Sequence, residues 1–275
     1  MTKTDEIYCN LIEDIMLNGE QVSGRNGNTL RSFTLPTVVF NSTPLVTVRK
    51  TAWRKAIREM EWFLSGHRKC PDELLDWWEG QLNKQNFYNA GYGEQFRKFL
   101  GADSEYDQIA ALLDGLRSHP FSRRHIITAW NPLDMSIITK LNNNERTPTT
   151  CHSTIVQFFV SDPGLLSMHS YQRSADFLLG VPHNWIQSWA LLLWLCAQTD
   201  TIPDKMLWTF GDAHLYKHSS HMQTVDQLLA IKLPLAHITP RLIYNGGINS
   251  DFHAADFEMI GTVPEPIVLI KPKLL

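Results

Sequence analysis

The chain has 275 residues, of which 43% are hydrophobic, and a formal net charge of −3 at pH 7. This length and apolar content allow a substantial core, and because there is no overall basic charge, binding to polymeric nucleic acid is not expected. The four cysteines lack the paired spacing of a metal site, no apolar run is long enough to cross a bilayer, and no basic-plus-apolar leader is present. We therefore expect one soluble domain, residues 1–275, in a reducing cytoplasmic compartment.

Residue patterns along the chain predict a mixture of helices and strands. Helical spacing of apolar residues, or a Gly-x-Pro start, marks the predicted helices, and branched or aromatic enrichment marks the extended segments. Predicted helices cover residues 4–17, 53–64, 107–118 and 182–198; predicted strands or extended segments cover residues 125–130, 154–160, 235–244 and 257–269. The polar stretch 141–150 is expected to be a loop. Together these elements predict an α+β fold with helices packed against a sheet.

Cys151 is the first candidate for a reactive group. A cysteine next to an apolar run is more often a small core residue than a nucleophile. Residues 149–154, however, read Thr-Thr-Cys-His-Ser-Thr, and the apolar run begins only afterwards. A cysteine at the polar mouth of a strand is better placed to react than to pack. A nearby cation such as Arg173 would favour its thiolate, so the pattern suggests covalent chemistry on a nucleotide.

The motifs around Cys151 resemble the thymidylate synthase family. The Cys-His pair is followed by Tyr-Gln-Arg-Ser-x-Asp-x-x-Leu-Gly-x-Pro-x-Asn over residues 171–184 and by Gly-Asp-x-His-Leu-Tyr over residues 211–216. Upstream, residues 122–132 resemble the family's paired-arginine segment, residues 58–64 its glutamate helix and residues 25–29 its flexible arginine loop. The resemblance covers nearly the whole chain. It implies an α+β fold with a mixed β-sheet packed with helices, dimerising through the sheet.

The resemblance implies folate-dependent one-carbon transfer to C5 of deoxyuridine monophosphate (dUMP), with 5,10-methylenetetrahydrofolate as cofactor. C5 of uracil is a poor nucleophile, and addition of the Cys151 thiolate at C6 creates an enolate that makes C5 reactive. Glu59 matches a carboxylate that organises water and proton transfers, a role that burial would favour by raising its pKa. Its alternative, a solvated helix glutamate, is weakened by apolar neighbours. The candidate catalytic residues are Cys151, Glu59, Asp176, Tyr92 and His152.

The resemblance also implies residues for phosphate, sugar and folate binding. The planar fork of arginine suits a phosphate dianion, and His214 with Tyr216 matches the pair that holds the ribose 3′-hydroxyl. Without the motif, a histidine such as His214 would more often be a hydrogen-bonded core residue than a ligand-binding residue. The candidate substrate-binding residues are Arg25, Arg123, Arg124, Gln172, Arg173, Ser174, Asn184, His214 and Tyr216. The candidate cofactor-binding residues are Trp78, Asp176 and Gly180.

Arg123 and Arg124 carry the expectation of a homodimer. Without the motif they would be taken for a solvated pair at the start of a strand. In the Ser-Arg-Arg context they match arginines that the family's partner subunit donates. Neither subunit would then have a complete site alone. No membrane or polymeric nucleic acid partner is expected.

Asn184 carries the expected choice of base. A carboxamide can accept from N3–H and donate to O4 of uracil, whereas a carboxylate would suit the amino group of cytosine. Asn184 therefore favours dUMP over deoxycytidine monophosphate (dCMP). Because this segment departs from the family pattern, His183 or Trp185 remains an alternative for part of that position.

Departures from the family pattern near the reacting carbon leave the product open. Gln81 stands where the family has a second tryptophan, and His183 stands where it has phenylalanine. Polar groups there could hold a water, and water rather than hydride at the last step gives 5-hydroxymethyl-dUMP. We therefore expect a hydroxymethylase, similar to viral enzymes that make modified pyrimidines and located in the host cytoplasm if viral. The alternative is a thymidylate synthase; a dCMP enzyme or a non-catalytic nucleotide-binding homologue is less favoured.

Overall fold

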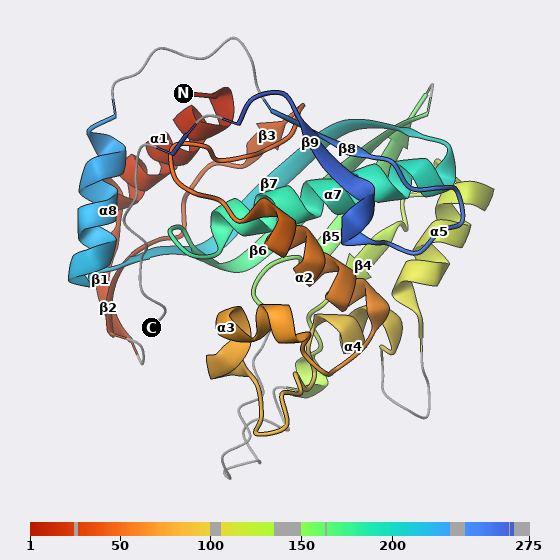
Figure 1. Cartoon of the computed structure of the whole chain (residues 1–275), viewed down its shortest axis with the longest axis horizontal. Coiled ribbons are helices and arrows are strands. Elements are labelled where there is room, and N and C mark those ends of the chain that lie inside the picture. The colour runs from red at the N-terminus through yellow and green to blue at the C-terminus, as the bar shows by residue number, and fades with distance from the viewer. Residues whose placement is uncertain are drawn as a thin grey trace.

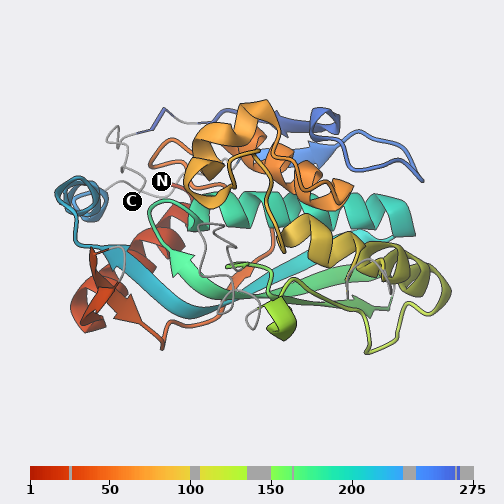
Figure 2. The same cartoon turned by 90° about the horizontal axis from the view of Figure 1, so that it is seen from below.

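A mixed β-sheet runs through the centre of the protein, and the long helices lie on one side of it (Figure 1; Figure 2). The computed structural model describes residues 1–24, 27–99, 106–134, 150–162, 164–231, 240–263 and 265–266. Within these residues the sheet has the order β1-β2-β7-β6-β5-β4, and β3 also pairs with β7. Its strands are β1 (Glu20–Gly24), β2 (Gly27–Ser32), β3 (Val38–Phe40), β4 (Ile126–Thr128), β5 (Ile155–Ser161), β6 (Leu165–Asp176) and β7 (Ile202–Tyr216). The predicted α+β class is confirmed.

The four predicted helices are all present within a residue or two of their expected bounds. The described helices are α1 (Lys3–Asn18), α2 (Trp53–Ser65), α3 (Leu75–Trp78), α4 (Tyr92–Arg97), α5 (Gln108–Ser118), α7 (Val181–Thr199) and α8 (Ser219–Leu229), with 3₁₀ turns η1 (Asp72–Leu74), η2 (Glu79–Gln81) and η3 (Ala254–Asp256). A second, two-stranded sheet pairs β8 (Arg241–Tyr244) with β9 (Phe257–Ile260). These strands fall within the extended segments predicted near the C-terminus. The predicted loop at 141–150 lies almost entirely outside the described residues.

Strands β6 and β7 are parallel, and α7 is the crossover that connects them. Their register places Ser174 beside Asp212 and Asp176 beside His214. A Cβ atom at Gly211 would lie 2.6 Å from Tyr171 Oη and 2.7 Å from the Arg173 carbonyl oxygen, so only glycine permits this approach. The two polar motifs therefore meet side by side, although the paired residues are 38 positions apart in the sequence.

Helix α7 is buried on nearly all sides because it lies between the sheet and α2 (Figure 2). Its sequence accordingly has no polar stripe except near its start, where Asn184 and Gln187 are buried as well. A buried polar side chain needs hydrogen-bonding partners. The start of α7 is therefore where a polar site within the protein is expected.

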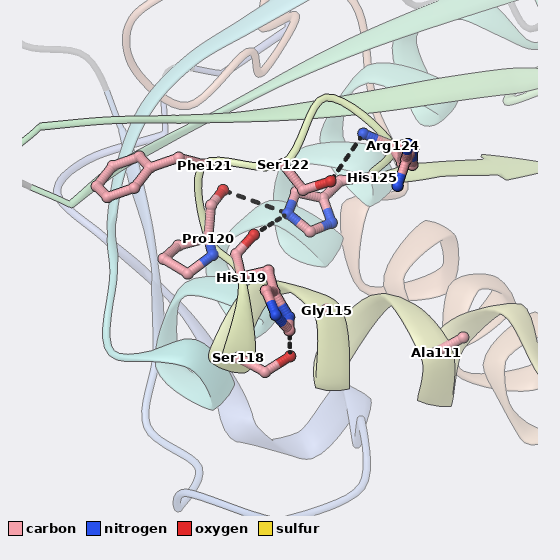
Figure 3. A pocket seen from close by; sticks show the side chains of 9 residues that line it. All are labelled: Ala111, Gly115, Ser118, His119, Pro120, Phe121, Ser122, Arg124 and His125. Carbon is pink, nitrogen blue, oxygen red and sulfur yellow. Dashed lines mark hydrogen bonds between the residues drawn. The ribbon is translucent and has the colours of Figure 1, made fainter.

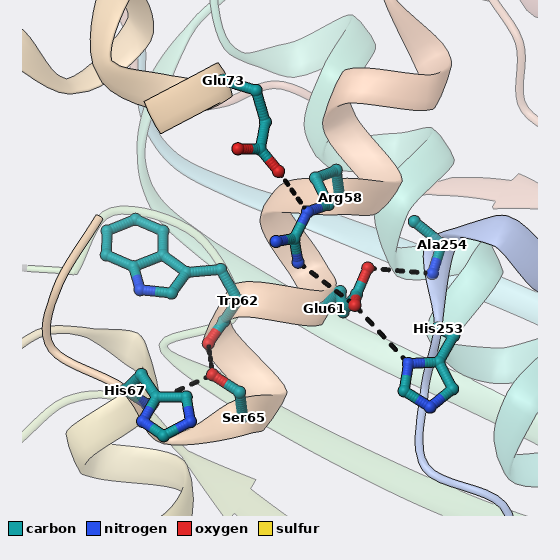
Figure 4. Close-up of polar contacts among 8 residues, drawn as sticks. All are labelled: Arg58, Glu61, Trp62, Ser65, His67, Glu73, His253 and Ala254. Atoms are coloured by element: carbon teal, nitrogen blue, oxygen red, sulfur yellow. Dashed lines mark hydrogen bonds and ion pairs between the residues drawn. The ribbon is translucent and has the colours of Figure 1, made fainter. Parts of the chain in front are cut away.

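Helix α2 is held on both flanks by ionic contacts (Figure 4). Arg58 lies 3.1 Å from Glu61 on the same helix and donates through Nε to Glu73 of η1 at 2.6 Å. Glu61 in turn accepts a hydrogen bond of 3.0 Å from the backbone N–H of Ala254 and lies 3.5 Å from His253 Nδ1. These contacts join α2 to the segments before α3 and before β9. They thereby fix the helix that carries Glu59.

The face of the sheet opposite the helices carries exposed apolar side chains. Along β5 the side chains alternate, with Ile155 and Phe159 exposed between buried neighbours. Val39 of β3, Ile126 of β4 and Ile202 of β7 are also exposed. We call these five residues the open sheet face. Separately, no helix in the described ranges is long and apolar enough to cross a membrane.

Candidate active site

Cys151 lies just before β5 and is held by α4 and β6. Its backbone N–H donates to Tyr92 Oη at 2.7 Å, and the N–H of His152 donates to the same oxygen at 3.0 Å. Its carbonyl accepts a hydrogen bond of 3.2 Å from the Ser174 N–H. The side chain itself is exposed to solvent. The backbone is thus fixed on both sides while the thiol remains accessible.

Arg173 places its guanidinium beside this thiol. Its Nε and Nη2 donate to the Thr150 carbonyl at 3.2 Å, and Nη2 lies 3.8 Å from Cys151 Sγ. The guanidinium also stacks over the Trp130 ring, 4.9 Å from its centroid. The protein surrounding the thiol raises the pKa of Cys151, and the charge of Arg173 opposes that rise. Arg173 is therefore the group that favours the thiolate here.

His152 is a neutral hydrogen-bonding group. Its ring stacks on Tyr92 at 4.5 Å, and burial lowers the pKa of His152 to about 3. At neutral pH the imidazole is therefore uncharged. It can orient a neighbour, but it holds no extra proton to give to a reacting group.

Tyr92 accepts both backbone hydrogen bonds at Cys151 and His152 through one hydroxyl group. Replacing Tyr92 by phenylalanine is expected to lower the free energy of unfolding by about 2 kcal/mol, because two backbone donors lose their partner. Turnover should fall as well, since the backbone of Cys151 is no longer held. Urea unfolding and steady-state kinetics measure both effects. Tyr88→Phe removes a hydroxyl from the neighbouring buried ring and is the matched control; an equal loss in both variants would contradict the role of Tyr92.

Glu59 is a buried carboxylate on α2, with 6% of its surface exposed. Oε1 accepts a hydrogen bond of 2.6 Å from the Trp78 indole. With its amide nitrogen turned toward α2, Gln187 donates to Glu59 Oε2 at 3.1 Å and to the Ala56 carbonyl at 3.0 Å. Burial raises the pKa of Glu59 to about 7, although both hydrogen bonds and the charge of Lys55 oppose the rise. Glu59 can therefore take up and release a proton near neutral pH.

The Trp78 indole N–H stabilises the ionised form of Glu59. Replacing Trp78 by phenylalanine removes a donor that lowers the pKa of Glu59, so that pKa is expected to rise above about 7. The limb of the pH–rate profile that reports Glu59 should then move to higher pH. Trp77→Phe is the control, because Trp77 packs on His183 at 4.8 Å instead. An unchanged profile in Trp78→Phe would show that the indole does not set this pKa.

Asn184 lies one turn before Gln187 on α7 and is 7% exposed. With the nitrogen on Glu59, the Gln187 amide oxygen lies 3.3 Å from His152 Nε2, which can donate to it, and 3.3 Å from Asn184 Oδ1. Gln187 thus bridges Glu59 to His152 and lies against Asn184. Gln187 was not predicted from the sequence, because a glutamine within an apolar helix carries no motif signal.

His183 and Trp185 point away from this polar cluster. His183 Nε2 lies 3.3 Å from the Ala52 backbone N–H, and Nδ1 lies 2.8 Å from the Leu179 carbonyl. Burial lowers the pKa of His183 to about 4. Trp185 is completely buried against Phe40. Both His183 nitrogens are thus engaged by the backbone rather than available to hold a water, and Asn184 is the residue of the three that joins the cluster.

His214 and Tyr216 lie together at the end of β7. Their rings meet edge to face at 5.3 Å, and His214 is 8% exposed. His214 Nδ1 lies 3.2 Å from the Asp212 carbonyl and 3.4 Å from Asp212 Oδ1. Asp212 carries an ion pair of 3.2 Å with Arg31 of β2. Neither Arg31 nor Asp212 was identified from the sequence.

Asp176 and Gln172 make contacts within the protein. Asp176 Oδ1 accepts from the backbone N–H groups of Leu178 and Leu179 at 2.9 Å, which shapes the turn before α7. Gly180 closes that turn by donating to the Asp176 carbonyl at 3.0 Å. Gln172 is 1% exposed; its oxygen accepts from the Trp208 indole at 3.0 Å and its nitrogen donates to the Ser174 carbonyl. In this structure the buried Gln172 side chain therefore links β6 to Trp208 of β7.

The remaining predicted arginines lie away from Cys151 in the fold or outside the described residues. Arg123 and Arg124 are exposed before β4, an edge strand that β5 separates from β6. Arg124 lines an open pocket of about 730 Å³ between α5 and this turn (Figure 3). Arg25 lies outside the described residues.

A known family and several known proteins match nearly the whole chain. The family described as "Thymidylate synthase" matches residues 6–272. The chain is 29% identical to the thymidylate synthase of Rhodopseudomonas palustris (strain BisA53), over 98% of each chain. It is 32% identical to bifunctional dihydrofolate reductase-thymidylate synthases of Arabidopsis thaliana and Zea mays, over 96% of this chain but 54% and 53% of those proteins. The chain therefore spans about half the length of these two plant relatives.

This protein belongs to the thymidylate synthase family. Enzymes of the family transfer one carbon to C5 of dUMP. Their cofactor and one-carbon donor is 5,10-methylenetetrahydrofolate.

Proposed function

We propose that this protein transfers one carbon from a folate to C5 of dUMP through a covalent adduct with Cys151. The observation that carries the proposal is an accessible thiol, 3.8 Å from the Arg173 guanidinium, on a backbone anchored by Tyr92. A non-catalytic nucleotide-binding protein would not need the thiol. Addition of the Cys151 thiolate to C6 of the uracil ring makes C5 the nucleophile.

Glu59 and Asn184 act on the base. Glu59, with a pKa of about 7, holds and releases the proton that the ring exchanges during the reaction. Asn184 reads N3–H and O4 of uracil through its carboxamide, and Gln187 and His152 support this end of the site. Gln187 bonds to Glu59 and lies 3.3 Å from Asn184, so it sets the two residues side by side.

Charged and polar groups hold the nucleotide's phosphate and sugar. Arg173 and Ser174 bind the phosphate from β6, joined by Arg25 of the same subunit, and Arg123 and Arg124 come from a second subunit. The sugar 3′-hydroxyl is held by His214 and Tyr216.

Three residues have groups that fit a folate. Trp78 offers a half-buried indole ring for stacking, and the Asp176 carboxylate is an acceptor for the donor edge of an aminopyrimidinone ring. Gly180, just before α7, donates its backbone N–H to the Asp176 carbonyl. When bound, 5,10-methylenetetrahydrofolate supplies the one-carbon unit. These three residues orient it and exclude water from C5.

For the product, we propose reductive methylation to thymidylate. The backbone contacts of both His183 nitrogens support this choice, because they remove a residue that was expected to hold water. The names of the relatives are in line with it. The second candidate is 5-hydroxymethyl-dUMP, favoured by the exposed Gln81 at the end of η2, where a polar group can hold water near the folate side. We also propose a reducing cytoplasmic setting, in line with the wide spacing of the four cysteines in the sequence.

The function is tested by incubating the protein with dUMP, or separately dCMP, and methylenetetrahydrofolate. Product mass and the absorbance of dihydrofolate are followed together. A gain of one CH₂ with stoichiometric dihydrofolate from dUMP is the expected result. A gain of CH₂O without dihydrofolate would establish hydroxymethylation. Turnover of dCMP alone, or none with either nucleotide, would overturn the proposal.

We further propose a homodimer formed through the open sheet face. The exposed Ile155 and Phe159, with the other three members of this face, form an apolar surface that a second copy would bury. A partner subunit would also bring the exposed Arg123 and Arg124 within reach of a second site. A face-to-face arrangement of two copies is self-complementary, as a two-fold dimer requires.

Mixing two inactive variants tests this dimer. A Cys151→Ala subunit retains both arginines, and a subunit with Arg123→Gln and Arg124→Gln retains the thiol. If arginines cross the interface, refolding an equal mixture should restore about a quarter of wild-type activity, because one site in each heterodimer is complete. Mixing Cys151→Ala with Glu59→Gln is the control and should restore nothing, since both residues belong to the same subunit's site. No recovery in the first mixture would contradict arginine donation.

A further inference from the structure

Arg31, Asp212 and His214 form a chain of contacts from β2 to β7. Arg31 Nη1 lies 3.2 Å from Asp212 Oδ2, and Asp212 Oδ1 lies 3.4 Å from His214 Nδ1. In the β2–β7 register Arg31 is the direct partner of His214, so both side chains project from the same face of the sheet. The guanidinium is also fixed at Nε, which donates to Thr29 Oγ1 at 3.1 Å.

The surroundings of His214 Nδ1 determine where the ring carries its hydrogen. Nδ1 faces the Asp212 carbonyl at 3.2 Å and Asp212 Oδ1 at 3.4 Å, and both are acceptors. Oδ1 is buried and has no closer hydrogen-bond donor among the described residues. A buried carboxylate oxygen is costly without a donor. Both facts place a hydrogen on Nδ1, and a ring that carries one hydrogen there has Nε2 as its acceptor.

Arg31 helps to keep Asp212 ionised, which is the form that this arrangement needs. The hydrogen bond from His214 lowers the pKa of Asp212, and the charges of Arg31 and Arg173 act in the same direction against burial. Asp212 is thus an anion and can only accept hydrogen bonds. Because Arg31 holds Oδ2, the other oxygen is aimed at His214.

We infer that Arg31 and Asp212 are positioning residues that hold His214 with its hydrogen on Nδ1, so that Nε2 accepts a hydrogen bond from the nucleotide's 3′-hydroxyl. The inference rests on the proposed function, which brings that hydroxyl to His214. It makes Arg31 a determinant of selectivity for nucleotides with a free 3′-hydroxyl, although Arg31 does not itself contact the sugar.

The test compares dUMP with 2′,3′-dideoxyuridine monophosphate, which lacks only the 3′-hydroxyl. Arg31→Gln should lower kcat/KM for dUMP about tenfold, the size of one hydrogen bond, and leave kcat/KM for the dideoxy nucleotide unchanged. Asp212→Asn should show the same pattern. Arg31→Lys, which keeps the charge near Asp212, should recover most of the loss. Arg241→Gln, an exposed arginine on β8, is the matched control.

A second readout is independent of turnover. In ¹⁵N-histidine spectra, the His214 signals, assigned with His214→Gln, should report hydrogen on Nδ1 in the wild type and a shift toward Nε2 in Arg31→Gln and Asp212→Asn. Equal losses for both nucleotides would show that Arg31 binds the phosphate or supports the fold, and would overturn the inference. So would hydrogen on Nε2 in the wild type. If wild-type protein does not turn over dUMP, the proposed function itself fails, and the two failures are therefore distinguishable.

Discussion

Replacing Cys151 by alanine is expected to lower kcat about 10⁴-fold or more, because no other group can form the covalent bond to C6. Affinity for dUMP should remain within about threefold of the wild type, since the thiol contributes little to binding the phosphate or sugar. Release of tritium from C5 of labelled dUMP measures the first effect, and calorimetric titration measures the second. Intact-mass spectrometry should show a nucleotide adduct only when Cys151 is present.

Cys9 provides the matched control for this substitution. It is a half-buried thiol on α1, with Sγ 3.9 Å from the Leu228 carbonyl, and Cys9→Ala should leave tritium release unchanged. Tritium release by Cys151→Ala at the wild-type rate would remove the covalent mechanism. Loss of dUMP affinity together with activity would instead indicate that the substitution disturbs the site.

Replacing Glu59 by glutamine is expected to lower kcat about 10³-fold, the usual contribution of a positioned proton carrier. Glutamine retains the size of the side chain, and Gln187 can turn its amide to match the new group. The fold should therefore persist. Glu61→Gln is the control on the same helix, because Glu61 bonds to Arg58, His253 and Ala254 rather than to the site.

The same substitution should change how stability depends on pH. The pKa of Glu59 is raised from 4.5 to about 7 in the folded protein, so between these values the folded state binds a proton that the unfolded state has lost. Stability due to Glu59 is thus present below pH 4.5 and is lost as pH rises toward 7, by about 3 kcal/mol in total. Glu59→Gln lacks this loss and should gain stability relative to the wild type over that window.

Urea unfolding at pH 5 and pH 8 measures this difference. Comparing the two proteins at each pH removes the contribution of groups that titrate in both, such as His152. A difference in free energy of unfolding that does not change with pH would show that Glu59 has an ordinary pKa. Burial would then not give Glu59 the ability to take up and release a proton near neutral pH.

The helices were predictable because their signals are local. Residues 4–17 carry apolar side chains at helical spacing, and α1 also begins with a capping box in which Thr2 and Asp5 bond to each other's backbone. Helix α7 was predictable from the Gly-x-Pro start and the long apolar run. In both cases neighbouring residues in the sequence decide the structure.

Strands β6 and β7 were not predicted, because residues of the candidate site interrupt the alternation of apolar and polar residues in their sequences. Several buried positions of these strands hold polar residues or glycine instead of apolar residues, among them Gln172, Gly211 and His214. In β7 the regular alternation ends at Phe210, which is followed by a buried glycine, and three consecutive buried residues precede Tyr216. The alternation of buried and exposed side chains that marks a strand is therefore absent at the site. Main-chain pairing with β6 and β2 nevertheless stabilises β7.

The sequence by itself determined the family and predicted the nucleophile and the phosphate-type arginine, because these depend on short motifs whose order along the chain is specific. Only the tertiary structure decided which side chains meet. It joined Gln187 to Glu59, turned both nitrogens of His183 to the backbone and set Arg31 against Asp212. These contacts depend on the packing of α2 on α7 and on strand register across β2 and β7. Such packing is set by the whole core rather than by local residue order.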